Sequence, residues 1–297
     1  MKRILIARSA GFCFGVKRAI AIADETAGKG DESGAGGERP IHSLGPIIHN
    51  PQAVERLERK GVRIVGGVDE ITCGKAIIRS HGVTRSDRSA LEKKGITIID
   101  ATCPFVTKAQ DHARRLSEEG YAVVVVGDPN HPEVKSIISY ISTGVPVFTS
   151  IEGMKKAKGG RKAGVVAQTT QSFDNLMAFV AEAMKRFPEV RVFNTICNAT
   201  TLRQEESTGL AGKADVMFVL GGYNSANTRR LAEICSAINP RTHHIETEGE
   251  VTTEMVRGAS VVGVTAGAST PQWIIDGFVK RLKGIWAKEK IEVSFYQ

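Results

Sequence analysis

The chain has 297 residues, of which 41% are hydrophobic and 24% are charged, with a net charge of +8. This composition excludes a disordered chain and suits two or three compact domains. The apolar run after Met1 is too short for a secretory signal, and no run reaches the roughly 18 apolar residues of a membrane helix, so we expect a cytoplasmic protein without membrane contact. The positive charge allows an anionic partner, but mixed charges without basic, aromatic-bearing runs disfavour nucleic acid.

Apolar, β-branched runs alternate with amphipathic stretches along the chain, the pattern of an α/β protein with mostly parallel sheets. Four such runs occur in each third, and a period near 90 residues indicates one small domain used three times. We predict domains at 1–102, 103–196 and 197–297, each with a four-stranded sheet. The predicted strands are 4–7, 41–43, 62–65 and 76–78, then 96–99, 123–126, 145–148 and 164–166, and finally 190–193, 216–220, 243–245 and 261–264.

Three cysteines follow this threefold rhythm. Cys13, Cys103 and Cys197 each follow a predicted strand and precede a predicted helix, at intervals of 90 and 94 residues. Thiolates are soft ligands, so three that converge from three similar units favour an iron site over three separate catalytic thiols. Chance burial of single cysteines is the alternative.

Polar residues follow other predicted strands at similar offsets from each cysteine, once a predicted Gly-rich loop at 28–37 is allowed for. In an open parallel sheet such residues lie at the carboxyl ends of the strands, where ligands bind. These polar residues are His49 and His81 in the first third, His131 and Thr169 in the second, and Asn224, Ser225 and Ser269 in the last. Proline at a predicted helix start directly follows Asn50, Cys103, His131 and Thr270, and the positive helix ends favour an anion between them.

Nine short motifs lie in order over nearly the whole chain. They are GFCFGV at 11–16, HN at 49–50, SHGV at 80–83, DATCP at 100–104, HPEV at 131–134, QTT at 168–170, ICNATTLRQ at 196–204, NSAN at 224–227 and TAGAS at 265–269. Together they closely resemble the LytB family, the 4-hydroxy-3-methylbut-2-enyl diphosphate reductases of the methylerythritol phosphate route to isoprenoids. One such motif alone is a weak signal, whereas nine with sensible spacing are highly specific.

The resemblance implies a pseudo-threefold trefoil of three α/β domains around one 4Fe–4S cluster held by Cys13, Cys103 and Cys197. Three thiolates leave one apical iron open, where it can act as a Lewis acid. The implied reaction is a two-electron reductive dehydroxylation that yields isopentenyl diphosphate and dimethylallyl diphosphate. An acidic electron donor such as ferredoxin or flavodoxin would suit a basic protein.

Glu133 is the acid that we expect to protonate the departing hydroxyl group. It lies two residues beyond His131 at a helix start, and burial there would raise its pKa. The alternative is a first-turn glutamate that stabilises the helix dipole. The resemblance adds His131 and Thr169 to the catalytic residues. It also implies an allylic diphosphate substrate bound by His49, His81, His131, Thr169, Ser225, Asn227 and Ser269.

Two other functions remain open from the sequence. One is another three-cysteine iron–sulfur enzyme, such as a quinolinate-synthase-like enzyme, although the motifs at 131–133 and 224–227 match the reductases better. The other is a non-enzymatic binding module with a structural metal, for which Cys-x-x-Cys pairs are expected and none occurs.

Overall fold

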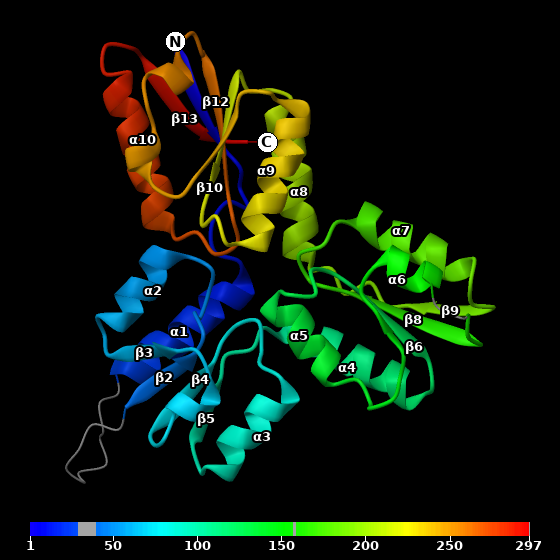
Figure 1. The fold of residues 1–297 in the computed structure, drawn as a ribbon. Helices are drawn as coiled ribbons and strands as arrows, with labels where there is room; N and C mark the ends of the chain where they lie inside the picture. The colour runs from blue at the N-terminus through cyan, green and yellow to red at the C-terminus, as the bar shows by residue number, and fades with distance from the viewer. Residues whose placement is uncertain (29–39, 157–158, 297) are drawn as a thin grey trace. The chain divides into compact units, whose positions relative to one another are not determined.

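The computed structural model describes residues 1–28, 40–156 and 159–296 (Figure 1). The chain divides into two compact units. The terminal unit comprises Met1–Val16, His49–Ala53 and Asn198–Gln297, and the central unit comprises Lys17–Ile48 and Val54–Cys197. The predicted loop at 28–37 lies, apart from its first residue, outside the described residues. None of the helices in the described ranges combines the length and apolar character needed to cross a membrane.

The terminal unit is built on one five-stranded parallel sheet with helices on both faces, as Figure 1 shows around β12. Side chains alternate along β10, so Phe218 packs with Phe278 of α10 on one face, while Val219 packs with Leu231 of α9 on the other. The sheet order is β11-β10-β12-β1-β13. Its elements are β1 (Lys2–Ile6), α8 (Asn198–Ala211), β10 (Val216–Leu220), α9 (Ala226–Ile238), β11 (Thr242–Ile245), η2 (Glu248–Glu250), η3 (Glu254–Val256), β12 (Val261–Ala266), α10 (Gln272–Ile285) and β13 (Ile291–Phe295).

The central unit contains two four-stranded parallel sheets, β3-β2-β4-β5 and β7-β6-β8-β9. Helices α6 and α7 lie on one face of the second sheet, and α4 and α5 lie on the other (Figure 1). The strands of the first sheet are β2 (Ile41–Leu44), β3 (Val62–Val65), β4 (Lys75–Ile78) and β5 (Thr97–Asp100), and η1 (Val68–Glu70) and α3 (Arg85–Lys93) lie between them in the chain. The strands of the second sheet are β6 (Ala122–Val126), β7 (Val147–Phe148), β8 (Lys162–Ala167) and β9 (Glu189–Val192). Its helices are α4 (Pro104–Glu118), α5 (Pro132–Ser139), α6 (Ile151–Lys156) and α7 (Phe173–Met184). Helices α1 (Phe14–Gly28) and α2 (Pro51–Glu58) contain residues of both units.

All three sheets share one strand order, in which the second strand lies at an edge and is followed by the first, third and fourth strands. In the terminal unit the fourth place is filled by β1, from the other end of the chain, with β13 beyond it. The predicted α/β class with parallel sheets is confirmed, but the assignment of strand 4–7 to the first sheet is wrong. The domain limits after residues 102 and 196 stay a prediction.

Two further strands join a different sheet from the one predicted. The strand at 96–99 pairs with β4 of the first sheet, and the strand at 190–193 pairs with β8 of the second, rather than each opening the sheet of the next third. The reason is that α3 and α7 supply the helical crossover that adjacent parallel strands require. Strand β13 was not predicted, although Ile291-Glu292-Val293-Ser294-Phe295 alternates like a half-buried strand, and it gives the terminal sheet five strands instead of four.

Candidate functional site

Each of the three predicted cysteine ligands follows the fourth strand of a sheet and precedes a helix. Cys13 lies between β1 and α1, Cys103 between β5 and α4, and Cys197 between β9 and α8. All five cysteines of the chain are thiols, and these three are half-buried. Since the positive end of a helix favours a negative charge beside it, the three positions suit thiolate ligands.

The backbone amide of each cysteine donates a hydrogen bond to a carbonyl group just beyond the end of the third strand of the same sheet. Cys103 N donates to Ser80 O at 2.9 Å, directly before His81, and Cys197 N donates to Thr169 O at 3.0 Å. In the terminal unit, Cys13 N donates to a carbonyl directly before Ser269, that of Ala268, at 3.1 Å. The same contact therefore sets each thiol beside one predicted substrate-binding residue.

The other two cysteines lie outside this pattern, as the sequence indicated. Cys235 is buried on α9, and burial raises the pKa of its thiol to about 12. Cys73 is exposed in the loop before β4. Neither follows the fourth strand of a sheet.

Glu133 occupies the first turn of α5 and is fully enclosed, with 1% of its surface exposed. Its Oε1 accepts a hydrogen bond from Thr169 N at 2.6 Å, and its Oε2 accepts one from Thr169 Oγ1 at 3.0 Å. Burial raises the pKa of the carboxyl group to about 7, although both bonds from Thr169 act to lower it. Glu133 therefore keeps a proton in a large fraction of molecules at neutral pH.

Two predicted histidines face one another in the central unit. The rings of His81 and His131 lie 5.3 Å apart, centroid to centroid, at an angle of 87°. His131 is the N-cap of α5, and its Nδ1 accepts a hydrogen bond from Glu133 N at 3.1 Å. A neutral ring that accepts at Nδ1 carries its proton on Nε2, so His131 presents an N–H donor together with a positive helix end.

The terminal unit gathers neutral donors at the start of α9. Ser225 is the N-cap of this helix, and Ser269 Oγ lies 3.4 Å from Ser225 Oγ and 3.1 Å from the carbonyl oxygen of His49. Asn227 is buried, and among the described residues its Nδ2 has no hydrogen-bond partner. A buried amide donor without an acceptor, next to a helix N-terminus and two hydroxyl groups, suits a phosphate oxygen.

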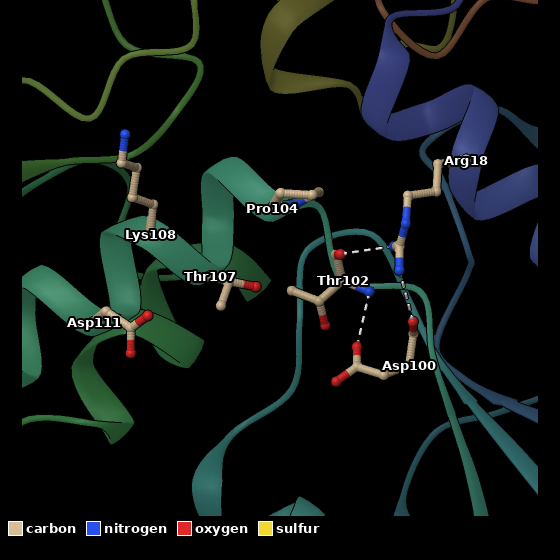
Figure 2. Close-up of a pocket in the computed structure, with 7 residues that line it drawn as sticks. All are labelled: Arg18, Asp100, Thr102, Pro104, Thr107, Lys108 and Asp111. Atoms are coloured by element: carbon tan, nitrogen blue, oxygen red, sulfur yellow. Dashed lines mark hydrogen bonds between the residues drawn. The ribbon is translucent and has the colours of Figure 1, made fainter.

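The segment that leads into Cys103 is held by Arg18 of α1 (Figure 2). Arg18 donates to Thr102 O at 3.0 Å and to Asp100 O at 3.4 Å, and the Asp100 carboxylate accepts from Thr102 N at 2.9 Å. Arg88 pairs with the same carboxylate at 2.7 Å. Arg18, Asp100 and Thr102 border a groove of about 450 Å³ whose other wall is the first two turns of α4.

A second arginine holds the segment that leads into Cys13. Arg203 of α8 is buried, and its guanidinium donates to Gly11 O at 2.8 Å and also to Ser9 O. Glu206, one turn further along α8, accepts from Ser9 N at 2.8 Å and from Ser9 Oγ at 2.6 Å. Because a buried guanidinium fixes the carbonyl groups that it bonds, α8 constrains this loop from two positions.

The structure therefore brings the predicted residues together within each unit. The central unit joins His81, His131, Glu133 and Thr169, and the terminal unit joins the backbone of His49 with Ser225 and Ser269. Arg18, Arg203 and Glu206 were not predicted from the sequence. Arg203 lies within the motif at 196–204, but the motif did not indicate its role. Arg18 and Glu206 cannot be told from ordinary charged residues of a helix surface in the sequence.

Known proteins resemble the chain over nearly its whole length. A family model described as "LytB protein" matches residues 4–283. A protein of Geobacter metallireducens named 4-hydroxy-3-methylbut-2-enyl diphosphate reductase is 52% identical over 282 residues, covering 95% of this chain and 97% of the relative. A protein of Trichlorobacter lovleyi with the same name is 53% identical over 280 residues, covering 94% and 97%.

Two solved structures agree with these relatives. One, titled as (E)-4-hydroxy-3-methyl-but-2-enyl diphosphate reductase, the terminal enzyme of the non-mevalonate pathway, is 44% identical with a TM-score of 0.71 and covers 96% of this chain and 100% of its own. The other, a reductase structure from Plasmodium falciparum, is 24% identical with a TM-score of 0.89, covers 99% and 92%, and supports the fold alone. The family model and the curated relatives, together with the shared fold, show that this chain belongs to the LytB family.

Proposed function

We propose that this LytB-family enzyme reduces 4-hydroxy-3-methylbut-2-enyl diphosphate to isopentenyl diphosphate and dimethylallyl diphosphate, the last step of the methylerythritol phosphate route. The curated relatives carry this reductase activity in their names. In the chain itself the proposal rests most directly on Glu133, an enclosed carboxyl group whose pKa is raised by burial to about 7. Hydroxide is a poor leaving group, so a proton held at neutral pH beside the substrate is what the reaction needs.

The reaction takes up two electrons and two protons and releases water. The allylic C–O bond breaks, one proton leaves with the hydroxyl group as water, and the other bonds to a carbon of the allyl group. A protonated Glu133 can donate to Thr169 Oγ1, which lies 3.0 Å from its Oε2, while the threonine hydroxyl donates onward to the substrate hydroxyl. His131 completes this catalytic set, because its Nδ1 holds the amide of Glu133 and its Nε2–H faces away from that bond.

Enzymes of this family depend on iron and sulfur, and we propose one 4Fe–4S cluster per chain on Cys13, Cys103 and Cys197. The fit is supported by three half-buried thiols at equivalent positions, each anchored through its amide at 2.9 to 3.1 Å to the neighbouring strand end. When bound, the cluster would supply electrons and, at the iron that has no protein ligand, Lewis acidity.

The diphosphate group is assigned to histidines and neutral donors. His49, His81 and His131 supply imidazole N–H groups, and Ser225, Asn227 and Ser269 supply donors at the start of α9. The unsatisfied Nδ2 of Asn227 supports this assignment, because a buried donor costs free energy until it finds an acceptor. The Thr169 hydroxyl serves the opposite end of the substrate.

The electrons are assigned to a small acidic carrier protein such as a ferredoxin or flavodoxin. Support comes from the net charge of +8, which steers an acidic partner toward the protein. A cytoplasmic location is part of the proposal, because thiolate ligands remain reduced in that compartment.

The test is anaerobic turnover of the hydroxylated diphosphate by the iron-loaded protein, with a reduced dye as electron source. We expect substrate-dependent oxidation of the dye and the appearance of both five-carbon diphosphates. Iron-loaded protein that leaves the substrate unchanged would contradict the proposed reaction. A colourless protein that binds one zinc ion after anaerobic reconstitution would contradict the proposed cofactor.

A further inference from the structure

A buried chain of hydrogen bonds links three segments of the central unit that carry predicted site residues. Gln110 Nε2 of α4 donates to Ser136 Oγ of α5 at 2.6 Å, and Ser136 Oγ donates to Val83 O at 2.8 Å. The Ser136 side chain has no exposed surface, and Gln110 is 6% exposed. Buried hydrogen bonds of this kind fix the relative positions of the segments that they join.

Each segment that these hydrogen bonds join also carries a residue of the candidate site. Ser136 is one helical turn after Glu133 on α5, whose N-cap is His131. Val83 is two residues after His81, in the loop that follows β4 of the other sheet. Gln110 belongs to α4, whose N-cap is Cys103. One serine hydroxyl therefore connects the loop of His81 with the helix of His131.

Gly82 shows how closely these segments approach. Its φ of +72° lies in the left-handed region, and a Cβ built there would lie 2.7 Å from Gln110 Nε2 and 2.9 Å from Ser136 Oγ. The loop of His81 thus passes directly over the Gln110–Ser136 bond with no room for a side chain. The contact is specific to glycine, and it brings the backbone beside His81 against both helices.

We propose that Ser136 is a positioning residue, held in place by the hydrogen bond from Gln110. It fixes the His81 loop against α5, and this contact sets the position of His81 relative to His131 for binding of the diphosphate group. The inference rests on the proposed diphosphate site. It adds residues that touch neither the substrate nor the cluster. Glu133 of α5 and Thr169, which follows β8, are joined by two hydrogen bonds that include no atom of Ser136, Gln110 or Val83, so we expect the link to govern binding more than protonation.

The test is Ser136→Ala in the iron-loaded enzyme, with inorganic diphosphate as the binding probe. Removing the hydroxyl leaves Gln110 Nε2 and Val83 O without their buried partner, so the His81 loop is released. We expect the Kd for inorganic diphosphate and the KM for substrate to rise about tenfold, with a much smaller change in kcat. The pH profile of kcat should keep its midpoint, because the hydrogen bonds that Glu133 accepts come from Thr169 and not from Ser136. Ser136→Cys, which keeps the size but is a weaker donor, should lie between alanine and wild type.

Ser117→Ala is the matched control. Ser117 is also a buried serine that links α4 to the segment after α5, through Ser142 at 3.2 Å, but it is two turns from Gln110 and remote from the His81 loop. It should lower the Tm and leave diphosphate binding unchanged. If Ser136→Ala does not fold, Gln110→Met removes the amide that donates to Ser136 Oγ, and it should raise the same Kd.

Two results would overturn the inference, and they are distinguishable. Wild-type affinity for inorganic diphosphate in folded Ser136→Ala, or in Gln110→Met if the first variant does not fold, would remove the positioning assignment alone. Failure of the wild-type enzyme to bind inorganic diphosphate would remove the diphosphate site on which it rests.

Discussion

At the scale of single residues, Glu133 combines opposing influences on one carboxyl group. Its enclosure raises the pKa, while the amide and hydroxyl of Thr169 lower it, and burial prevails at a value of about 7. A glutamate that only stabilised the helix dipole would be expected to stay ionised at the surface. With 1% of its surface exposed, Glu133 fits the proton donor better than this alternative.

Glu133→Gln should abolish most turnover and leave binding intact. The amide keeps the shape and a hydrogen-bond acceptor for Thr169 but has no proton to transfer, so we expect kcat to fall by about two to four orders of magnitude. Iron content and the KM should remain close to wild type. Anaerobic assays with a reduced dye measure kcat and KM, and a colorimetric iron determination measures the iron content. Glu182→Gln on α7 is the buried-glutamate control, which should keep full turnover. Wild-type kcat in Glu133→Gln would exclude this residue as the acid.

The pH dependence follows from the raised pKa. Because only the protonated carboxyl group can donate, turnover should decline as the pH rises through about 7. Thr169→Val removes the side-chain bond that lowers this pKa, so the decline should move to higher pH, at a reduced overall rate. Thr169→Ser keeps the hydroxyl and should behave as wild type. A shift to lower pH in Thr169→Val, read from kcat/KM profiles, would contradict the assignment.

Both members of this pair could be named from the sequence, but their contact could not. Glu133 follows the first strand of its sheet and Thr169 follows the third, and the two are 36 residues apart. They meet because β6 and β8 are hydrogen-bonded neighbours, which the apolar runs do not reveal. Arg203 illustrates the other limit, since a buried arginine and an exposed one look alike in a single sequence.

At the scale of elements, the repeated unit is a sheet whose fourth strand is followed by a loop with a cysteine before the next helix. Strand positions were most predictable where the run is continuously apolar and buried, as in β6 and β10. The neighbours of each strand could not be predicted, because the fourth place in the terminal sheet is filled by β1 from the opposite end of the chain. The polar ends of β4, β8 and β12 still lie beside the cysteines, since parallel strands end at the same edge of a sheet.

Arg203→Met should weaken the hold on the cluster. The carbonyl groups of Ser9 and Gly11 lose their donor, so the loop that carries Cys13 gains freedom. We expect cluster absorbance to decay about tenfold faster in the presence of an iron chelator, as for a metal site whose outer-shell partner is removed. Arg281→Met, which removes a comparable bond to Val251 O in the same unit, is the control and should retain iron normally. Equal rates in both variants and wild type would contradict the assignment to Arg203.

At the scale of the whole molecule, three sheets of one strand order are each followed by one of the cysteines that we propose to hold a single iron–sulfur cluster. Composition and the period of the apolar runs were sufficient for the α/β class, and the ordered motifs were sufficient for the family. The closing of the last sheet by β1 was not predictable, because nothing in the pattern of residues 4–7 distinguishes the first sheet from the last. Recognition of the proposed electron donor depends on how charge is distributed over the surface, and the sequence gives only the net charge.

Mössbauer spectroscopy of the anaerobic protein, with and without substrate, tests the central claim most directly. It reports the number of irons and distinguishes an iron that lacks a thiolate ligand from those that have one. We predict about four irons per chain, as in a cluster held by three cysteines, with the signal of a single iron changing when the hydroxylated diphosphate is added. Four equivalent thiolate-bound irons, or a spectrum that substrate leaves unchanged, would contradict the account.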